Sequence, residues 1–462
     1  MLGGFFLFVF LRNISTYTPK QFHKFLLYKY KKCKNMDKQV IKKIITERHQ
    51  EVRERRLVKR PQLFEHKMNY VLVGIRRAGK SCLMIQDMQQ RVAANEIAIE
   101  DCLYINFEDE RIRYMPATEL GLILDCYAEM FGDHKPLIYL DEIQVIEGWE
   151  QFVRRLSDQQ YRVMVTGSNA KMLSSEIAST LGGRFVIREI WPFSFREYLS
   201  YRGVALEKNW QYDSVTLHEI ARRMEEYFYF GGFTEAFDLV DKREWINSLY
   251  QKILMGDIVA RHGLRNTRSI RLLAKKLADS VMQPTALSRL QNIIKSSGEK
   301  IGLDTVKDYL QYFEESYLTF SLPNFVSPLT DQETIKKRYY TDNGLLNNFL
   351  FNGETKLLEN LCAIHLMKQY SNTDEPRLFY YNRNIEVDFY VPEAGLAVQA
   401  SYDINDDETR RREISALVSL NKAFPLKSAI IVTRDHEEQI EEGGLNIEVI
   451  PVWKWLINVN DD

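Results

Sequence analysis

The chain has few of the groupings that build disulfide or zinc sites. Its five cysteines form no Cys-x-x-Cys pair, and its eight histidines do not cluster with them. Disulfide frameworks and zinc sites need such residues at short, regular spacings. We therefore expect neither a disulfide framework nor a zinc site.

Long apolar runs are also missing. The stretch 5–11 is too short to span a bilayer, and no basic residue precedes it, as a signal peptide requires. Residues 1–35 are predicted to be a disordered tail or to precede the true start at Met36, where a helical pattern begins; a peripheral membrane anchor is the alternative. We predict no integral membrane segment and a cytoplasmic location.

A strong net charge is absent as well, since the formal charge is −1. The charges are nevertheless uneven, because residues 1–60 hold 16 Lys/Arg against 4 Asp/Glu. Contact with nucleic acid or an anionic membrane is one interpretation, and a solvated helix face over 40–60 is the other. With 462 residues, 45% of them hydrophobic and 27% charged, the chain is long enough for about three domains.

The most specific motif is an apolar strand at 70–73 that runs into Gly-x-x-x-x-Gly-Lys-Ser. This spacing predicts a loop whose backbone N–H groups surround a triphosphate, because glycine allows the close turn and a helix N-terminus favours anions. Lys80 would reach the β- and γ-phosphates, and the Ser81 hydroxyl would bind Mg²⁺. The predicted nucleotide-binding residues are Gly74, Ile75, Arg76, Arg77, Ala78, Gly79, Lys80, Ser81 and Cys82.

A second buried strand, 137–140, ends in two adjacent acids. Asp141 would hold the Mg²⁺ shell, and Glu142 would orient and polarise the attacking water. Small-molecule kinases of the P-loop class usually lack the second acid. The pair therefore favours hydrolysis over phosphoryl transfer.

Two more strands end in polar residues. The strand at 161–167 leads to Ser168 and Asn169, and we expect Asn169, or else Ser168, to sense the γ-phosphate. The strand at 102–107 ends at Glu108 and Asp109. Because ligands bind at the carboxyl edge of parallel strands, these residues are expected to gather there.

These segments resemble the prokaryotic AAA-type P-loop ATPases that carry a C-terminal domain of unknown function with a restriction-endonuclease-like core. The resemblance covers about residues 40–460. It implies ATP as the nucleotide and Arg184 as a contact to the γ-phosphate; an arginine paired at the surface is the alternative. It rests on Gly-Ile-Arg-Arg-Ala-Gly-Lys-Ser, Tyr-Ile-Asn-Phe-Glu-Asp, Leu-Asp-Glu-Ile-Gln, Thr-Gly-Ser-Asn-Ala, Leu-Gly-Gly-Arg and Trp-Pro-Phe-Ser-Phe-Arg-Glu-Tyr, in the order of the family.

The predicted fold class is α/β. A P-loop NTPase domain with a parallel sheet is expected at 36–210, a helical and winged-helix-like region at 211–325, and a C-terminal α/β restriction-endonuclease-like domain at 326–462. Helix-like segments at 272–282, 286–295 and 303–316 suit a winged helix, which in the family can dock in a DNA groove. The last of these segments is rich in acids, which favours a structural or protein-contact role.

The C-terminal domain carries the skeleton of a metal-dependent nuclease. Glu359 lies in a predicted helix and Asp388 in a predicted strand, whereas Gln399 and Ser401 stand where active relatives carry Glu-x-Lys. Neutral glutamine is a poor Mg²⁺ ligand, and serine cannot supply the lysine's charge. We expect this site to be degenerate.

The sequence thus predicts an ATPase that hydrolyses ATP with Mg²⁺ to drive a conformational change on a protein or nucleic-acid partner. The partner is unknown, and DNA contact and assembly into a homo-oligomer are left open. A slowly hydrolysing ATP-gated switch or scaffold in signalling or defence is the alternative. An ATP-dependent nuclease is less favoured because of Gln399 and Ser401.

Overall fold

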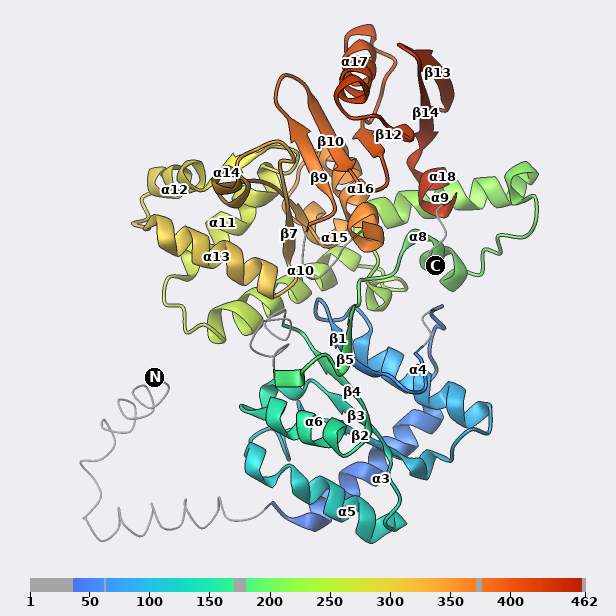
Figure 1. Ribbon diagram of the computed structural model, residues 1–462, viewed down its shortest axis with the longest axis vertical. Coiled ribbons are helices and arrows are strands. Elements are labelled where there is room, and N and C mark those ends of the chain that lie inside the picture. Colours follow the sequence, from blue (N-terminus) through green and yellow to red (C-terminus); the bar gives the residue numbers. More distant parts are fainter. Residues whose placement is uncertain (1–35, 62–63, 170–179, 371–375, 459–462) are drawn as a thin grey trace. The chain divides into compact units, whose positions relative to one another are not determined.

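The computed structural model describes residues 36–61, 64–169, 180–370 and 376–458 (Figure 1). The chain divides into two compact units: unit 1 comprises Met1–Arg55 with Met88–Val163, and unit 2 comprises Arg56–Asp87 with Met164–Asp462. Each is described by itself. The predictions for residues 1–35 lie outside the described residues. Within the described ranges, no helix is long and apolar enough to cross a membrane.

Unit 1 is built on two parallel strands, β2 (Cys102–Asn106) and β3 (Leu137–Asp141). They pair in register, with Asn106 opposite Asp141. Both strands are almost entirely buried, as expected for parallel strands with continuous apolar sequences. The helices of this unit are α3 (Lys38–Glu54), α5 (Gly121–Phe131) and α6 (Trp149–Asp158).

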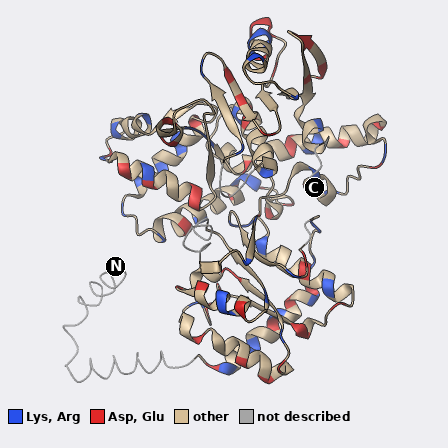
Figure 2. Cartoon of the chain, in the orientation of Figure 1, with Lys and Arg blue, Asp and Glu red and all other residues tan. Residues whose placement is uncertain are grey.

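Helix α3 carries several of the basic residues between 40 and 60. It begins at Asp37, whose side chain accepts a hydrogen bond from the backbone N–H of Gln39, and it buries Ile41, Ile44 and Ile45 on one face. On its other face, basic side chains pair with acids, and hydrogen bonds from Lys38 and Lys42 lower the pKa of Glu129 to about 2. Figure 2 shows blue and red residues interspersed along the helices, which fits the solvated, ion-paired interpretation.

Unit 2 opens with three parallel strands, β1 (Asn69–Val73), β4 (Arg162–Gly167) and β5 (Phe185–Glu189). Strand β1 lies between the other two, and its last residue, Val73, is in register with Gly167 and Glu189. The predicted parallel α/β sheet is therefore confirmed. Residues that follow β1 and β4 leave the sheet at the same edge, where α4 (Lys80–Ala93) begins after β1.

Helices follow β5. Helix α8 (Phe195–Tyr201) starts with a capping box between Ser194 and Glu197. Then come α9 (Ser214–Phe230), α10 (Lys242–Lys252) and a π-helix (Ile253–Ala260) that continues α10. The run of helices is interrupted after Phe230, where Gly231 and Gly232 follow.

Asp342 holds this glycine break in place. Its carboxylate accepts hydrogen bonds from the backbone N–H of Gly232 at 2.8 Å and from that of Gly344 at 2.8 Å. A Cβ at Gly231 would lie 2.1 Å from the same carboxylate, so only glycine fits there. Burial of Asp342 raises its pKa to about 6, although these N–H groups oppose the shift.

The next region combines three helices with a small antiparallel sheet. The helices are α11 (Thr267–Asp279), α12 (Leu287–Ser296) and α13 (Leu303–Glu315), close to the three predicted segments. The strands β6 (Thr285–Ala286), β7 (Thr319–Pro323) and β8 (Ile335–Tyr340) form the order β6-β8-β7. Short helices α14 (Leu329–Thr334) and α15 (Asn343–Asn347) flank β8.

The chain ends in a mixed sheet of six strands, in the order β13-β14-β12-β11-β10-β9. The parallel neighbours are β11 with β12 and β12 with β14, and the remaining pairs are antiparallel. Its core includes Val387, Ile431 and Ile447, with Leu417 and Leu420 packed on them from α17. The elements are α16 (Glu354–Tyr370), β9 (Phe379–Asn382), β10 (Glu386–Val391), β11 (Leu396–Ala400), α17 (Asp407–Ala423), β12 (Ser428–Thr433), β13 (Glu438–Glu442), β14 (Leu445–Pro451) and α18 (Val452–Asn458).

Candidate functional site

The loop between β1 and α4 has the backbone that its sequence predicts. Gly74 and Gly79 have φ angles of 140° and 96°, and Arg77 between them is also left-handed, at 69°. A Cβ added to Gly74 would lie 2.1 Å from the carbonyl oxygen of Ile190. The loop can therefore pass the end of β5 only because position 74 has no side chain.

Lys80 is buried and lies against this loop. Its Nζ donates to the carbonyl oxygens of Gly74, at 2.9 Å, and of Ile75, at 3.1 Å. A lysine held at the loop carbonyls is a cation fixed at the mouth of an anion-binding turn. Ser81 and Cys82 follow in the first turn of α4 and are partly buried.

Arg60 stabilises the loop through hydrogen bonds, and the sequence analysis did not identify it. Its guanidinium donates to the carbonyl oxygens of Ala78, at 3.1 Å, and Trp191, at 3.2 Å, and to both carboxylate oxygens of Glu197, at 2.6 and 3.0 Å. Burial acts to raise the pKa of Glu197, but the charge and hydrogen bonds of Arg60 outweigh burial and lower it.

Two arginines of the loop pair with acids that lie far along the chain. Arg76 forms a bidentate ion pair with Asp257, with Nε and Nη2 each 2.9 Å from a carboxylate oxygen. Arg77 donates to Glu235 at 2.6 and 2.7 Å. The first pair is largely buried, with side chains 17% and 7% exposed, whereas the second is open to solvent, at 53% and 44%.

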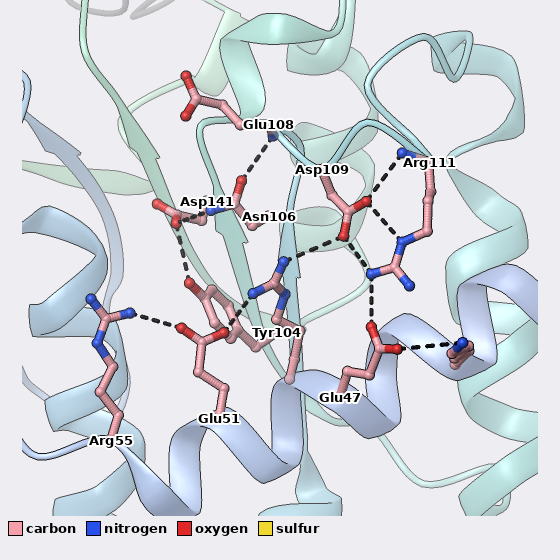
Figure 3. A network of polar contacts seen from close by, with 11 residues as sticks. Glu47, Glu51, Arg55, Tyr104, Asn106, Glu108, Asp109, Arg111 and Asp141 are labelled. Carbon is pink, nitrogen blue, oxygen red and sulfur yellow. Dashed lines mark hydrogen bonds and ion pairs between the residues drawn. The ribbon is translucent and has the colours of Figure 1, made fainter.

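In unit 1, Asp141 is fully buried at the end of β3 (Figure 3). Its Oδ2 accepts hydrogen bonds from the Tyr104 hydroxyl, at 3.1 Å, and from Nδ2 of Asn106, at 2.8 Å, both on β2. Burial, followed by the charge of Asp141, raises the pKa of Tyr104 well above its usual value, so this phenol remains a donor. The two donors fix the orientation of the carboxylate.

Glu142 follows with a left-handed backbone, φ 52°, which is uncommon for a residue other than glycine. Its side chain is largely buried, and its Oε2 accepts a hydrogen bond of 2.5 Å from Nε2 of Gln144. The Oε1 of Gln144 is buried and makes no hydrogen bond within the described part of the chain. The sequence analysis assigned no role to Gln144, which lies two residues after Glu142.

The acids expected beside Asp141 are placed differently. Glu108 is exposed, and its backbone N–H donates to Oδ1 of Asn106. Asp109 turns to Arg111 and Arg48, and the hydrogen bond from Arg111 is the main cause of its lowered pKa. Arg111 bridges Asp109 to Glu47 of α3 (Figure 3). Arg48, which lies on α3 itself, donates to Asp109 and to Glu51. Asp109 therefore belongs to an ion-pair network that fastens α3.

The predicted phosphate sensors lie in unit 2. Ser168 and Asn169 are buried and follow β4 at the edge where Gly74 follows β1. Arg184 precedes β5 and is exposed, and its carbonyl oxygen accepts from Nδ2 of Asn69 at 3.3 Å. Asn169 thus lies past the same edge of the sheet as Gly74, whereas Arg184 lies at the opposite edge, and the roles of both residues stay predictions.

The nuclease-like positions form a separate cluster around Lys337 of β8. This lysine is fully buried, and its Nζ lies 2.9 Å from Asp388, 2.9 Å from Glu386 and 3.3 Å from Glu359. Tyr339 also donates to Glu359, at 2.7 Å. Burial of Glu359, and next the charge of Asp388, raise the pKa of Glu359 to about 8.

Gln399 and Ser401 have structural contacts. Gln399 accepts from the backbone N–H of Asp388, at 2.8 Å, and donates to the carbonyl oxygen of Glu386, at 3.1 Å. The Ser401 hydroxyl donates to the carbonyl oxygen of Asp403 at 3.1 Å. Among the described residues, no group of three His, Cys, Asp or Glu side chains is arranged to hold a metal ion.

Comparison with known proteins identifies two regions. Residues 66–199 match an AAA domain, and residues 221–373 match a domain of unknown function (DUF8612). The region of unknown function therefore begins in α9, whereas the resemblance to the family placed it in the C-terminal domain. The second match covers α10 to α13 as well as the start of that domain.

Two relatives match most of the chain. The uncharacterized protein MJ1544 of Methanocaldococcus jannaschii is 32% identical over 84% of this chain and 88% of its own length. An uncharacterized protein of Haemophilus influenzae is 29% identical over 84% of this chain and 94% of its own length. Among solved structures, the Walker-type ATPase PABY2304 of Pyrococcus abyssi aligns with 68% of this chain and 96% of its own, at 14% identity and a TM-score of 0.38.

Proposed function

Because the chain belongs to the same family as its archaeal relative MJ1544 and carries an AAA domain, we propose that it binds ATP with Mg²⁺ and hydrolyses it. One observation carries the proposal. The loop at 74–79 turns on two left-handed glycines, and the buried Lys80 holds its charge against the loop carbonyls. Such a turn presents its N–H groups and one cation to a phosphate chain.

In this proposal Lys80 moves from the loop carbonyls to the β- and γ-phosphates when the nucleotide binds. Ser81 and Asp141 hold Mg²⁺, which when bound neutralises charge between the phosphates. The donor set fits a hard cation, since both residues offer oxygen. Asp141 is supported in this role because Tyr104 and Asn106 leave its carboxylate one orientation.

Glu142 then takes a proton from the attacking water. The left-handed backbone of Glu142 and its bond to Gln144 support this role, because strained backbone persists where the surroundings fix a functional side chain. The free Oε1 of Gln144 can accept a hydrogen bond from the same water. Asn169 would contact the γ-phosphate from the end of β4. Arg184 lies at the opposite edge of the sheet, where β5 begins beside Asn69, so its contact to a γ-phosphate would be made across a subunit boundary in a homo-oligomer.

We propose that ATP hydrolysis drives a conformational change on a protein or nucleic-acid partner. Helices α11–α13 with the β6-β8-β7 sheet are consistent with a winged helix. The exposed side chains of α13 include Asp304, Lys307 and Asp308, and this mixed, acid-rich face favours a protein contact over DNA. The slow switch or scaffold remains the alternative to fast turnover.

A nuclease activity is not supported by the Lys337 cluster. The ammonium of Lys337 lies between the carboxylates that a metal would need, and Gln399 and Ser401 are used in backbone contacts. We propose that Glu359, Asp388, Gln399 and Ser401 no longer form a nuclease site.

Nucleotide binding tests the proposal. The full chain is titrated with a fluorescent ATP analogue and Mg²⁺, and Lys80→Ala is compared with Lys59→Ala, an exposed lysine outside the loop. Binding by the wild type and Lys59→Ala but not by Lys80→Ala supports the proposal. Equal binding by both variants, or no binding by the wild type, contradicts it.

A further inference from the structure

Asp257 is a buried acid that the proposed chemistry does not use. It is the one charged residue between Ile253 and Ala260, and its neighbours Ile253, Leu254, Ile258 and Val259 are all buried. Burying a carboxylate in apolar surroundings is costly unless a charged partner meets it. A stretch of helix that only had to pack would carry no acid here.

The partner is the nucleotide-binding loop. Arg76, two residues after Gly74, meets Asp257 with two parallel hydrogen bonds of 2.9 Å. Arg261 is the other cation near Asp257, with an N–O distance of 4.0 Å. Bidentate arginine–carboxylate pairs are strong and directional, so this contact fixes the loop relative to the π-helix.

Asp257 lies in a π-helix, which is a rare conformation that often marks functional positions. The π-helix continues α10, which packs into the rest of unit 2 through aromatic rings. Tyr250 lies 4.9 Å from Phe349 between ring centroids, and Phe349 lies 5.7 Å from Tyr340. The Tyr340 hydroxyl in turn donates to the carbonyl oxygen of Ala274 in α11, at 2.6 Å.

We infer that Asp257 is the positioning residue through which the nucleotide-binding loop is coupled to α10 and the π-helix, so that nucleotide binding changes the stability of residues 242–260. The inference rests on the proposed nucleotide binding and adds to it the regulation of that site. A ligand that changes the conformation of the loop must move Arg76. Because the bidentate ion pair joins Arg76 to Asp257, Asp257 moves with it. Coupling of this kind acts in both directions between the two regions.

Arg77 and Glu235 supply a matched control. They form a second ion pair from the same loop to the same part of the chain, but both side chains are about half exposed. Exposed pairs contribute little because water and salt screen them. Removing Glu235 should therefore leave the coupling intact, whereas removing the buried charge of Asp257 should abolish it.

The test is amide hydrogen exchange of the full-length protein with and without a saturating, non-hydrolysable ATP analogue and Mg²⁺. In the wild type and in Glu235→Gln, the analogue should change exchange severalfold in peptides covering 242–260. In Asp257→Asn, exchange near 74–82 should still respond, and exchange at 242–260 should not. Asp257→Glu, which keeps the charge, should restore part of the response.

An equal response at 242–260 in Asp257→Asn and wild type overturns the inference. The inference is also overturned if, in the wild type, the analogue slows exchange at 74–82 and leaves exchange at 242–260 unchanged. This comparison uses the wild type alone, so it does not depend on whether a variant folds. If 74–82 does not respond in the wild type, nucleotide binding itself has failed, and the inference falls with the proposed function. Exchange at 74–82 therefore separates the two failures.

Discussion

The Nζ of Lys337 lies 2.9 Å from Oδ1 of Asp388, although 51 residues separate them in the chain. The same ammonium contacts Glu359 and Glu386, so one buried cation is shared by three carboxyl groups from two elements. Here a side chain of the protein itself supplies the positive charge, from a strand outside the sheet that carries Asp388.

Lys337→Met should therefore destabilise the protein strongly. Removing one partner of a buried ion pair costs about 3–5 kcal/mol, because the remaining charges stay buried without compensation. The measurement is urea unfolding, followed by circular dichroism. Lys336→Met is the control, since Lys336 lies next to Lys337 in the same strand, is partly exposed and pairs with the exposed Glu333 at 3.5 Å. A similar loss of stability in both variants would contradict the structural role of Lys337.

The contribution of Asp342 to the free energy of unfolding should fall as the pH rises from about 4 to 6. Burial raises the pKa of Asp342 to about 6 from 3.8, so the folded state binds the proton more tightly than the unfolded state. Asp342→Asn cannot ionise and should lose this dependence. A shift of about two pKa units corresponds to a change of about 3 kcal/mol in the free energy of unfolding across this pH range.

This pH effect is measured as the difference in unfolding free energy between wild type and Asp342→Asn at several pH values from 4 to 7. As the pH rises, the free energy of unfolding of the wild type should fall relative to that of Asp342→Asn. A difference that stays constant with pH would show that Asp342 titrates normally in the folded protein.

Gln144→Ala should slow hydrolysis by about tenfold while the KM for ATP stays near its wild-type value. Gln144 contacts Glu142 at 2.5 Å and is proposed to orient the base and the water, so its loss affects the transition state more than nucleotide binding. Steady-state phosphate release gives both constants. A raised KM with an unchanged kcat would instead assign Gln144 to nucleotide binding.

Gly74→Ala should prevent nucleotide binding and lower the melting temperature. The new Cβ would lie 2.1 Å from the carbonyl oxygen of Ile190, which follows β5 and whose backbone N–H donates to the carbonyl oxygen of Val73, so the loop must move. Gly132→Ala is the matched control, because Gly132 also has a left-handed φ, 93°, with nothing within 4 Å of the new Cβ. It should cost about 1 kcal/mol from backbone strain alone. Normal nucleotide binding by Gly74→Ala would contradict the loop geometry.

The sequence predicted the parts of the structure that depend on local pattern. The strands that end at Val73, Asn106, Asp141 and Gly167 are apolar runs followed by polar residues, and each strand was found within a residue or two of its prediction. The three helices α11–α13 follow from apolar residues at helical spacing. The glycine motif fixed the turn at 74–79 because few other sequences allow it.

Long-range pairs were missed. Nothing in the local sequence indicates that Lys337 is buried, because its partners Glu359 and Asp388 lie 22 and 51 residues further on. Arg60 lies 137 residues before Glu197. Asp257 can be recognised in the sequence as a lone acid in an apolar run. An acid that is buried in such a run needs a cationic partner.

The most direct test of the central claim is steady-state phosphate release from ATP and Mg²⁺ by the full chain and by Glu142→Gln, across protein concentrations and with or without DNA. The account predicts turnover by the wild type and none by Glu142→Gln, which should still bind ATP. A rate that rises with protein concentration or with DNA would identify self-association or DNA as part of the cycle. Equal hydrolysis by the two proteins, or tight ATP binding without any turnover by the wild type, would contradict the account.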